Sequence, residues 1–122
     1  MMHYIIISLA SNHDATYHLN EARNCLAQIF SNIKYTQEIF TEPINAKRKD
    51  MYLNQLAAFE TTMDDTEINA LLKSIEKLIG RTDEDRQQGI VNIDLDLLQY
   101  DDLHFHLKDW ERAYVVELLP QL

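Results

Sequence analysis

Two aspartates stand two residues apart in the segment Val91–Tyr100, which has the apolar-rich pattern of a β-strand. Because side chains two apart on a strand lie on the same face, Asp94 and Asp96 should project side by side, roughly 7 Å apart. Mg²⁺ is usually held by one or two carboxylates together with substrate phosphates. The pair therefore suits a metal–nucleotide site. The alternative is a strand side that faces water, where screening weakens the repulsion between the two charges.

The composition is that of a single folded domain spanning residues 1–122. Hydrophobic residues make up 46% and charged residues 25% of the chain, which is ordinary globular usage. The formal net charge of −9 disfavours nucleic acid as a partner, because binding a phosphate backbone needs clustered Lys and Arg. A polyphosphate substrate would have to arrive as a metal complex or meet a local basic patch.

The chain offers no signal for a membrane or for a disulfide. Its opening apolar run, residues 4–10, is far shorter than the ~20 residues of a membrane span and lacks a basic leader, so we expect a buried strand and a cytoplasmic location. Cys25 is the single cysteine, which excludes an internal disulfide. Its helical surroundings favour a core thiol over a nucleophile.

Hydrophobic periodicity predicts the order of the helices and strands. We expect strands at about 3–10, 33–40, 52–61 and 91–100, and helices at about 14–30, 65–80 and 110–119. The apolar faces of the first two helices would carry Tyr17, Leu19, Ala22, Leu26, Ile29 and Phe30, and Ile68, Leu71, Leu72, Ile75 and Leu78. Residues 41–50 and 81–89 read as polar loops. This order predicts an α+β fold, a ferredoxin-like βαββαβ sandwich with an antiparallel sheet and a short C-terminal helix.

Four groups of residues along the chain together resemble one enzyme family. They are Tyr52-Leu53-Asn54, Ile75-Glu76 with Gly80-Arg81, Ile93-Asp94-Leu95-Asp96, and His106 with Arg112. The combined pattern is similar to 6-hydroxymethyl-7,8-dihydropterin pyrophosphokinase of folate biosynthesis, and the similarity covers nearly the whole chain. It implies an ATP-dependent diphosphokinase that transfers pyrophosphate from ATP to the pterin and releases AMP. The resemblance implies two Mg²⁺ ions as cofactors and the small molecules pterin and ATP as partners, and the sequence gives no sign of an oligomeric state.

The resemblance also implies a role for each matching residue. The metal ligands would be Asp94 and Asp96, which would act in catalysis together with Arg112. The pterin would contact Thr41, Glu42, Ile44, Tyr52, Asn54 and Tyr114. The nucleotide would contact Glu76, His106 and Arg112. Stacked aromatic rings suit a flat heterocycle, and cationic side chains suit phosphate. Without the family, the two tyrosines would be typical of core packing, and Glu76 of a solvated helix face.

The segment before the paired aspartates departs from the family pattern. Typical members carry several Arg residues and a Trp there, whereas this chain has Asp83, Gln88 and Val91 at three of those positions. Loss of one charged hydrogen bond to phosphate weakens binding by roughly 1.5–3 kcal/mol. The bases that could compensate are Lys47, Arg48, Lys73 and Lys108. Two alternatives therefore stay open: a non-catalytic descendant that binds a pterin or a nucleotide, and an interaction module without a small ligand.

Overall fold

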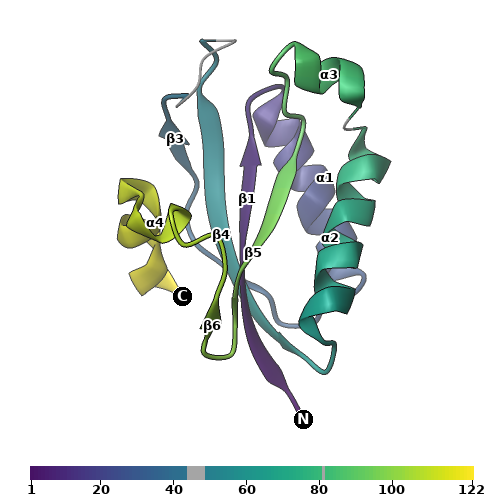
Figure 1. Ribbon diagram of the computed structural model, residues 1–122, viewed down its shortest axis with the longest axis vertical. Coiled ribbons are helices and arrows are strands. Elements are labelled where there is room, and N and C mark those ends of the chain that lie inside the picture. Colours follow the sequence, from purple (N-terminus) through teal and green to yellow (C-terminus); the bar gives the residue numbers. More distant parts are fainter. Residues whose placement is uncertain (44–48, 81) are drawn as a thin grey trace.

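The computed structural model describes residues 1–43, 49–80 and 82–122. Its strands are β1 (His3–Ser11), β2 (Lys34–Tyr35), β3 (Ile39–Thr41), β4 (Tyr52–Thr61), β5 (Asp94–Tyr100) and β6 (Leu103–His104). Its helices are α1 (Ala15–Ala27), α2 (Asp65–Ile79), α3 (Asp83–Gln87) and α4 (Ala113–Leu118), with 3₁₀ turns at Asp109–Glu111 and Leu119–Gln121. The helices α1 and α2 lie on one face of the sheet and α4 lies on the other (Figure 1).

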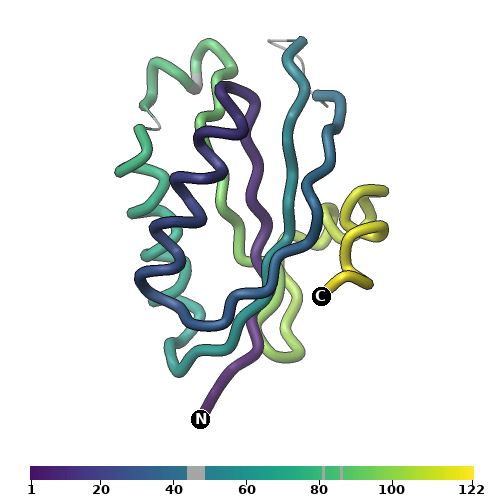
Figure 2. Tube along the Cα trace, turned by 180° about the vertical axis from the view of Figure 1, so that it is seen from behind, coloured from purple at the N-terminus to yellow at the C-terminus, as the bar shows by residue number. Residues whose placement is uncertain are grey.

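The strands form one antiparallel sheet in the order β2–β4–β1–β5–β6, with β3 also paired to β4. The long strands β1 and β4 occupy the centre, and each has a neighbour on both sides. This order is that of a ferredoxin-like sandwich, with β2 and β3 together in the place of the second strand. The predicted α+β fold is therefore confirmed. The trace seen from behind shows α1 and α2 side by side across the sheet (Figure 2).

The core is divided between the two faces of the sheet because consecutive side chains alternate. On β1, Ile5, Ile7 and Leu9 pack under α1 and α2, whereas Ile6 packs under α4. On β5, Leu95 and Leu97 join the core beneath the two long helices. The aspartates that alternate with them consequently lie on the α4 face. The α4 cluster is smaller and leaves part of that face open.

The ends of α2 follow from local chemistry. Asp64 and Glu67 form a reciprocal capping box, in which each side chain accepts a hydrogen bond from the backbone of the other residue. Gly80 ends the helix in the left-handed region, with a φ of 108°, a conformation that suits a residue without a Cβ. Both boundaries agree with the prediction. Helix α1 is shorter than predicted and ends at Ala27.

Three further predicted elements were wrong in their extent. The strand expected at 33–40 is split into β2 and β3, because the backbone N–H of Gln37 donates to Gln121 Oε1 instead of to a strand. The final helix is a single α-helical stretch, α4, between two 3₁₀ turns. The strand expected from Val91 begins at Asp94, because Asn12 engages the Val91 backbone through both its own backbone and its side chain.

The loop expected at 81–89 contains the short helix α3. Thr82 Oγ1 accepts a hydrogen bond from Asp85 N at 3.1 Å, and the first turn carries three acidic side chains, which the helix dipole favours. Three side chains expected on apolar helix faces are instead exposed: Tyr17 (61%), Ile29 (43%) and Leu78 (77%). Cys25 is partly buried against the main core, as expected of a packed thiol.

Candidate active site

A cavity of about 490 Å³ lies on the face of the sheet that α1 and α2 do not cover. Its floor is formed by side chains of three neighbouring strands: Ser8 and Ala10 of β1, Asn54 of β4, and Asp94 and Asp96 of β5. Its walls are formed by Thr41, Glu42 and Tyr52 on the β3–β4 side, and by Asp109, Arg112, Ala113 and Tyr114 beside α4. The small residues of β1 stand directly opposite the two aspartates in the sheet, which leaves room above the carboxylates.

The two carboxylates on the floor repel each other. Burial, and after it the neighbouring Asp94, raise the pKa of Asp96 from 3.8 to about 6, although His106 and Lys73 act in the opposite direction. Only 20% of the Asp96 side chain is exposed. A cation between the carboxylates would remove this repulsion. No three His, Cys, Asp or Glu side chains of the described residues gather closely enough to hold a metal by themselves.

Strand β6 pairs with β5 at Gln99 and Tyr100, and beside Leu95 the edge of β5 is completed by side chains of α2. Glu76 Oε2 accepts a hydrogen bond from Leu95 N at 2.7 Å, and Lys73 Nζ lies 3.3 Å from the same carboxylate oxygen. The interpretation of Glu76 as a solvated residue was wrong, because its side chain is almost wholly buried. Leu95 stands between the two aspartates, so this bond fixes the backbone that carries both.

The wall beside α4 brings together an aromatic ring and a cation. The Cζ atom of Arg112 lies 5.8 Å from the centroid of the Tyr114 ring, and its Nε lies 3.8 Å from Asp109 Oδ1. Burial raises the pKa of Tyr114, which keeps its hydroxyl neutral at physiological pH. Since Tyr52 lines the cavity from the β4 side, the opening between the walls is bounded by two aromatic side chains.

The segment between β6 and α4 is held by Trp110. Its Nε1 donates to Phe105 O at 3.0 Å, and its ring stacks on His104 with a centroid distance of 4.1 Å. His106 has a left-handed φ of 53°, and its Nε2 lies 3.8 Å from Asp96 Oδ1. Such backbone conformations cost a non-glycine residue roughly 1–3 kcal/mol and are frequent at functional sites. The segment therefore brings His106 close to Asp96 and Arg112 to the cavity wall.

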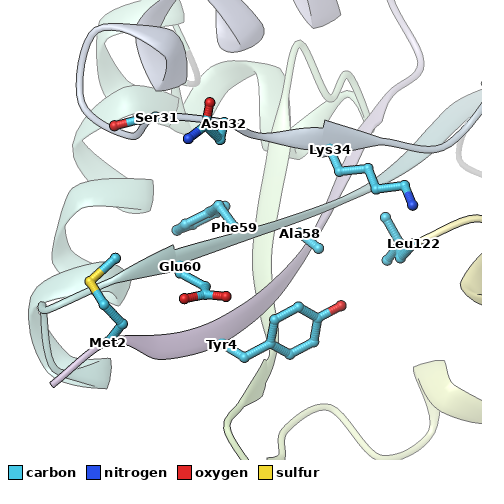
Figure 3. Close-up of a pocket in the computed structure, with 9 residues that line it drawn as sticks. All are labelled: Met2, Tyr4, Ser31, Asn32, Lys34, Ala58, Phe59, Glu60 and Leu122. Carbon is cyan, nitrogen blue, oxygen red and sulfur yellow. The ribbon is translucent and has the colours of Figure 1, made fainter.

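A second cavity, of about 410 Å³, lies beside the far ends of β1 and β4 (Figure 3). Lys34, Glu60 and Tyr4 line it together with apolar side chains. The described residues around it include one carboxylate and no pair of acids, so the chemistry predicted from the sequence belongs to the first cavity.

Comparison with known proteins places the chain in a family. The model of the family 7,8-dihydro-6-hydroxymethylpterin-pyrophosphokinase (HPPK) matches residues 6–122. The chain belongs to the HPPK family. It is also similar to the folate synthesis bifunctional protein, mitochondrial, of Pisum sativum, with 30% identity over 128 residues that cover 97% of this chain and 25% of that protein. The chain thus spans about a quarter of the length of the curated relative that it matches.

Most residues predicted from the HPPK resemblance lie around the first cavity. Those that line it are Thr41, Glu42, Tyr52, Asn54, Asp94, Asp96, Arg112 and Tyr114. His106 does not line the cavity but lies 3.8 Å from Asp96, which does. Glu76 lies on α2 and accepts a hydrogen bond from the backbone of β5. Ile44 lies outside the described residues, as do the candidate bases Lys47 and Arg48. The individual roles of these residues stay predictions.

Four lining residues were not predicted: Ser8, Ala10, Asp109 and Ala113. The first two could have been found, because they alternate with the apolar Ile7 and Leu9 in the opening strand. Nothing in the local pattern marks Asp109, which reaches the cavity only through the fold of the segment that Trp110 holds.

No helix within the described parts of the chain has the length and apolar character needed to cross a membrane. The cytoplasmic location stays a prediction.

Proposed function

We propose that this chain transfers the β,γ-pyrophosphoryl group of ATP to the hydroxymethyl oxygen of 6-hydroxymethyl-7,8-dihydropterin and releases AMP. One observation carries the proposal: a pair of aspartates on the floor of a single cavity lies between walls that hold Tyr52 and Tyr114. Membership of the HPPK family supports the reaction class, and the cavity offers the groups that such a reaction needs.

The carboxylates fit the Mg²⁺ ions that the family implies. Asp94 and Asp96 supply hard oxygen donors. Burial and the neighbouring Asp94 raise the pKa of Asp96 to about 6, and a divalent cation would stabilise the charged carboxylates against both effects. Two carboxylates leave coordination positions for water and phosphate oxygens, which is the usual arrangement of Mg²⁺ with a nucleotide. When bound, the ions would neutralise negative charge on the transferred phosphates.

The residues of the cavity walls have separable tasks in this proposal. Tyr52 and Tyr114 stack on the pterin ring from opposite sides. Asn54 Nδ2 already donates to Thr41 Oγ1 at 2.8 Å, which fixes the orientation of the amide beside the ring. Arg112 pairs with phosphate oxygens as charge develops on them. The pterin hydroxyl oxygen bonds to the β-phosphorus, the bond from that phosphorus to the bridging oxygen of AMP breaks, and the hydroxyl proton is released.

A second candidate function is binding of a pterin or nucleotide without transfer. It is favoured by the acidic first turn of α3, where Asp83, Glu84 and Asp85 precede the paired aspartates. These charges disfavour a triphosphate at a place where family members carry bases.

The test is AMP release by the purified protein given ATP, Mg²⁺ and 6-hydroxymethyl-7,8-dihydropterin. We expect pterin-dependent AMP from the wild type and none from Asp96→Asn. Asp102→Asn, the same substitution at an exposed turn, is the matched control and should keep the activity. If the folded wild type releases no AMP but still binds the pterin or a nucleotide, the second candidate function replaces the first.

A further inference from the structure

Lys73, a base on α2, lies at the edge of β5 beside the paired aspartates, and all of its polar contacts there are long. Lys73 Nζ lies 3.3 Å from Glu76 Oε2, 3.4 Å from Leu95 O and 3.8 Å from Asp96 Oδ1. Charge-assisted hydrogen bonds from an ammonium to a carboxylate are typically ~2.7–2.9 Å long. All three contacts are longer, and 53% of the Lys73 side chain is exposed. The ammonium is therefore held near the carboxylates without an ideal partner.

Lys73 extends from α2 to Asp96, which lines the cavity. His106 Nε2 lies 3.8 Å from Asp96 Oδ1, the same oxygen that lies 3.8 Å from Lys73 Nζ. Two nitrogen groups thus meet at this oxygen, whereas Arg112 lies beside Asp109 on the α4 wall. Of the other candidate bases, Lys108 is exposed and directly precedes the turn Asp109–Glu111.

We propose that Lys73 binds the terminal phosphates of the nucleotide, in place of a base missing from the segment 82–91. This inference rests on the proposed function, because it requires a polyphosphate at Asp94 and Asp96. Once Asp96 is engaged by a cation, the ammonium keeps Glu76 as its anionic neighbour and gains a phosphate oxygen as a second one. Glu76 thereby keeps the base at the edge of β5, and its own bond to Leu95 N keeps Glu76 in place.

The test measures binding instead of turnover. An ATP analogue with a methylene group between the α- and β-phosphorus atoms cannot release AMP, so calorimetry in Mg²⁺ reports its affinity directly. We expect Lys73→Gln to weaken binding of this analogue about tenfold or more, the effect of losing one charged hydrogen bond. Lys73→Arg should keep most of the affinity. Lys77→Gln, an exposed lysine one turn further along α2, is the matched control and should bind as the wild type does.

Two further ligands distinguish a role of Lys73 in phosphate binding from a role in supporting β5. Lys73→Gln should leave the affinity for AMP unchanged, because AMP lacks the terminal phosphates. It should bind Mg²⁺ alone at least as tightly as the wild type, because a positive charge 3.8 Å from Asp96 has been removed. An equal loss of affinity for the analogue, AMP and Mg²⁺ would assign Lys73 to support of the strand and overturn the proposal.

The failure of this inference is distinguishable from the failure of the proposed function. If the wild type releases AMP from ATP and Lys73→Gln binds the analogue as tightly as the wild type does, only the assignment of Lys73 is refuted. If the folded wild type neither binds the analogue nor releases AMP, the proposed function is refuted, and the inference that rests on it is refuted as well.

Discussion

Replacement of Asp96 by Asn should stabilise the metal-free protein while removing its reaction. Burial and the nearby Asp94 raise the pKa of the Asp96 carboxyl from 3.8 to about 6. The folded protein therefore binds this proton more tightly than the unfolded chain does. The stabilising contribution of the protonated group is complete below about pH 3.8 and is lost as the pH rises through about 6. An asparagine carries no charge at any of these pH values, so the variant does not lose stability at this position as the pH rises.

The size of the effect follows from the two pKa values. A change from 3.8 to about 6 corresponds to about 3 kcal/mol, at ~1.4 kcal/mol per pH unit. Since one-fifth of the side chain is exposed, screening lowers the expected gain in the free energy of unfolding to about 1–3 kcal/mol at pH 8. The asparagine amide can also donate to the Asp94 carboxylate, which removes the repulsion between the two positions.

The assay is urea unfolding in a metal chelator from pH 4 to pH 8. The stability advantage of Asp96→Asn should be small at pH 4 and grow to its full value at pH 8. Asp101→Asn provides a control of opposite sign, because hydrogen bonds from His3 and from the Tyr4 backbone lower the pKa of Asp101. That variant should be less stable than the wild type at pH 8. An Asp96→Asn variant no more stable than the wild type throughout this range would refute the reasoning.

Three further outcomes are expected. Glu76→Gln should lower the free energy of unfolding by about 1 kcal/mol in chemical denaturation, because a neutral amide oxygen accepts more weakly from Leu95 N than a buried carboxylate does. Asn12→Ala should lower it by about 2–4 kcal/mol and increase hydrogen exchange at Val91, because the side chain bonds to Gly89 O and Val91 N are lost. Tyr114→Ala should weaken pterin binding roughly tenfold in a fluorescence titration while Tyr114→Phe keeps it, because the ring and not the hydroxyl stacks on the ligand.

The sequence predicted the elements that have a regular hydrophobic period. Strand β4 and helix α2 were found with nearly correct boundaries, because burial on one or both faces and the cap residues at 64 and 80 give strong local signals. The side on which Asp94 and Asp96 project was also predicted correctly, since alternation on a strand requires no tertiary information.

Three of the errors share one cause, which is a contact distant in sequence. Asn12 fixes Val91 from 79 residues away and delays the start of β5. Gln121 reaches Gln37 across 84 residues and interrupts the strand expected at 33–40. Without the family resemblance, Glu76 is typical of a solvated helix face, yet its side chain bonds to Leu95 N of β5 and is buried. No local pattern carries this information, because the partner is set by the packing of the whole sheet.

The charges of the cavity indicate how the proposed triphosphate could be held. Four of the described lining residues are acids, Glu42, Asp94, Asp96 and Asp109, and Arg112 is the one base among them. Arg112 already faces Asp109 at 3.8 Å, so it offers little excess positive charge to a ligand. A free nucleotide would be repelled, and a cation bound to two carboxylates reverses that local field. Lys73 and His106 meet at Asp96 Oδ1, where the Lys73 ammonium would add positive charge. In the proposal the phosphates are then held by bases on separate elements, Lys73 of α2 and Arg112 beside α4.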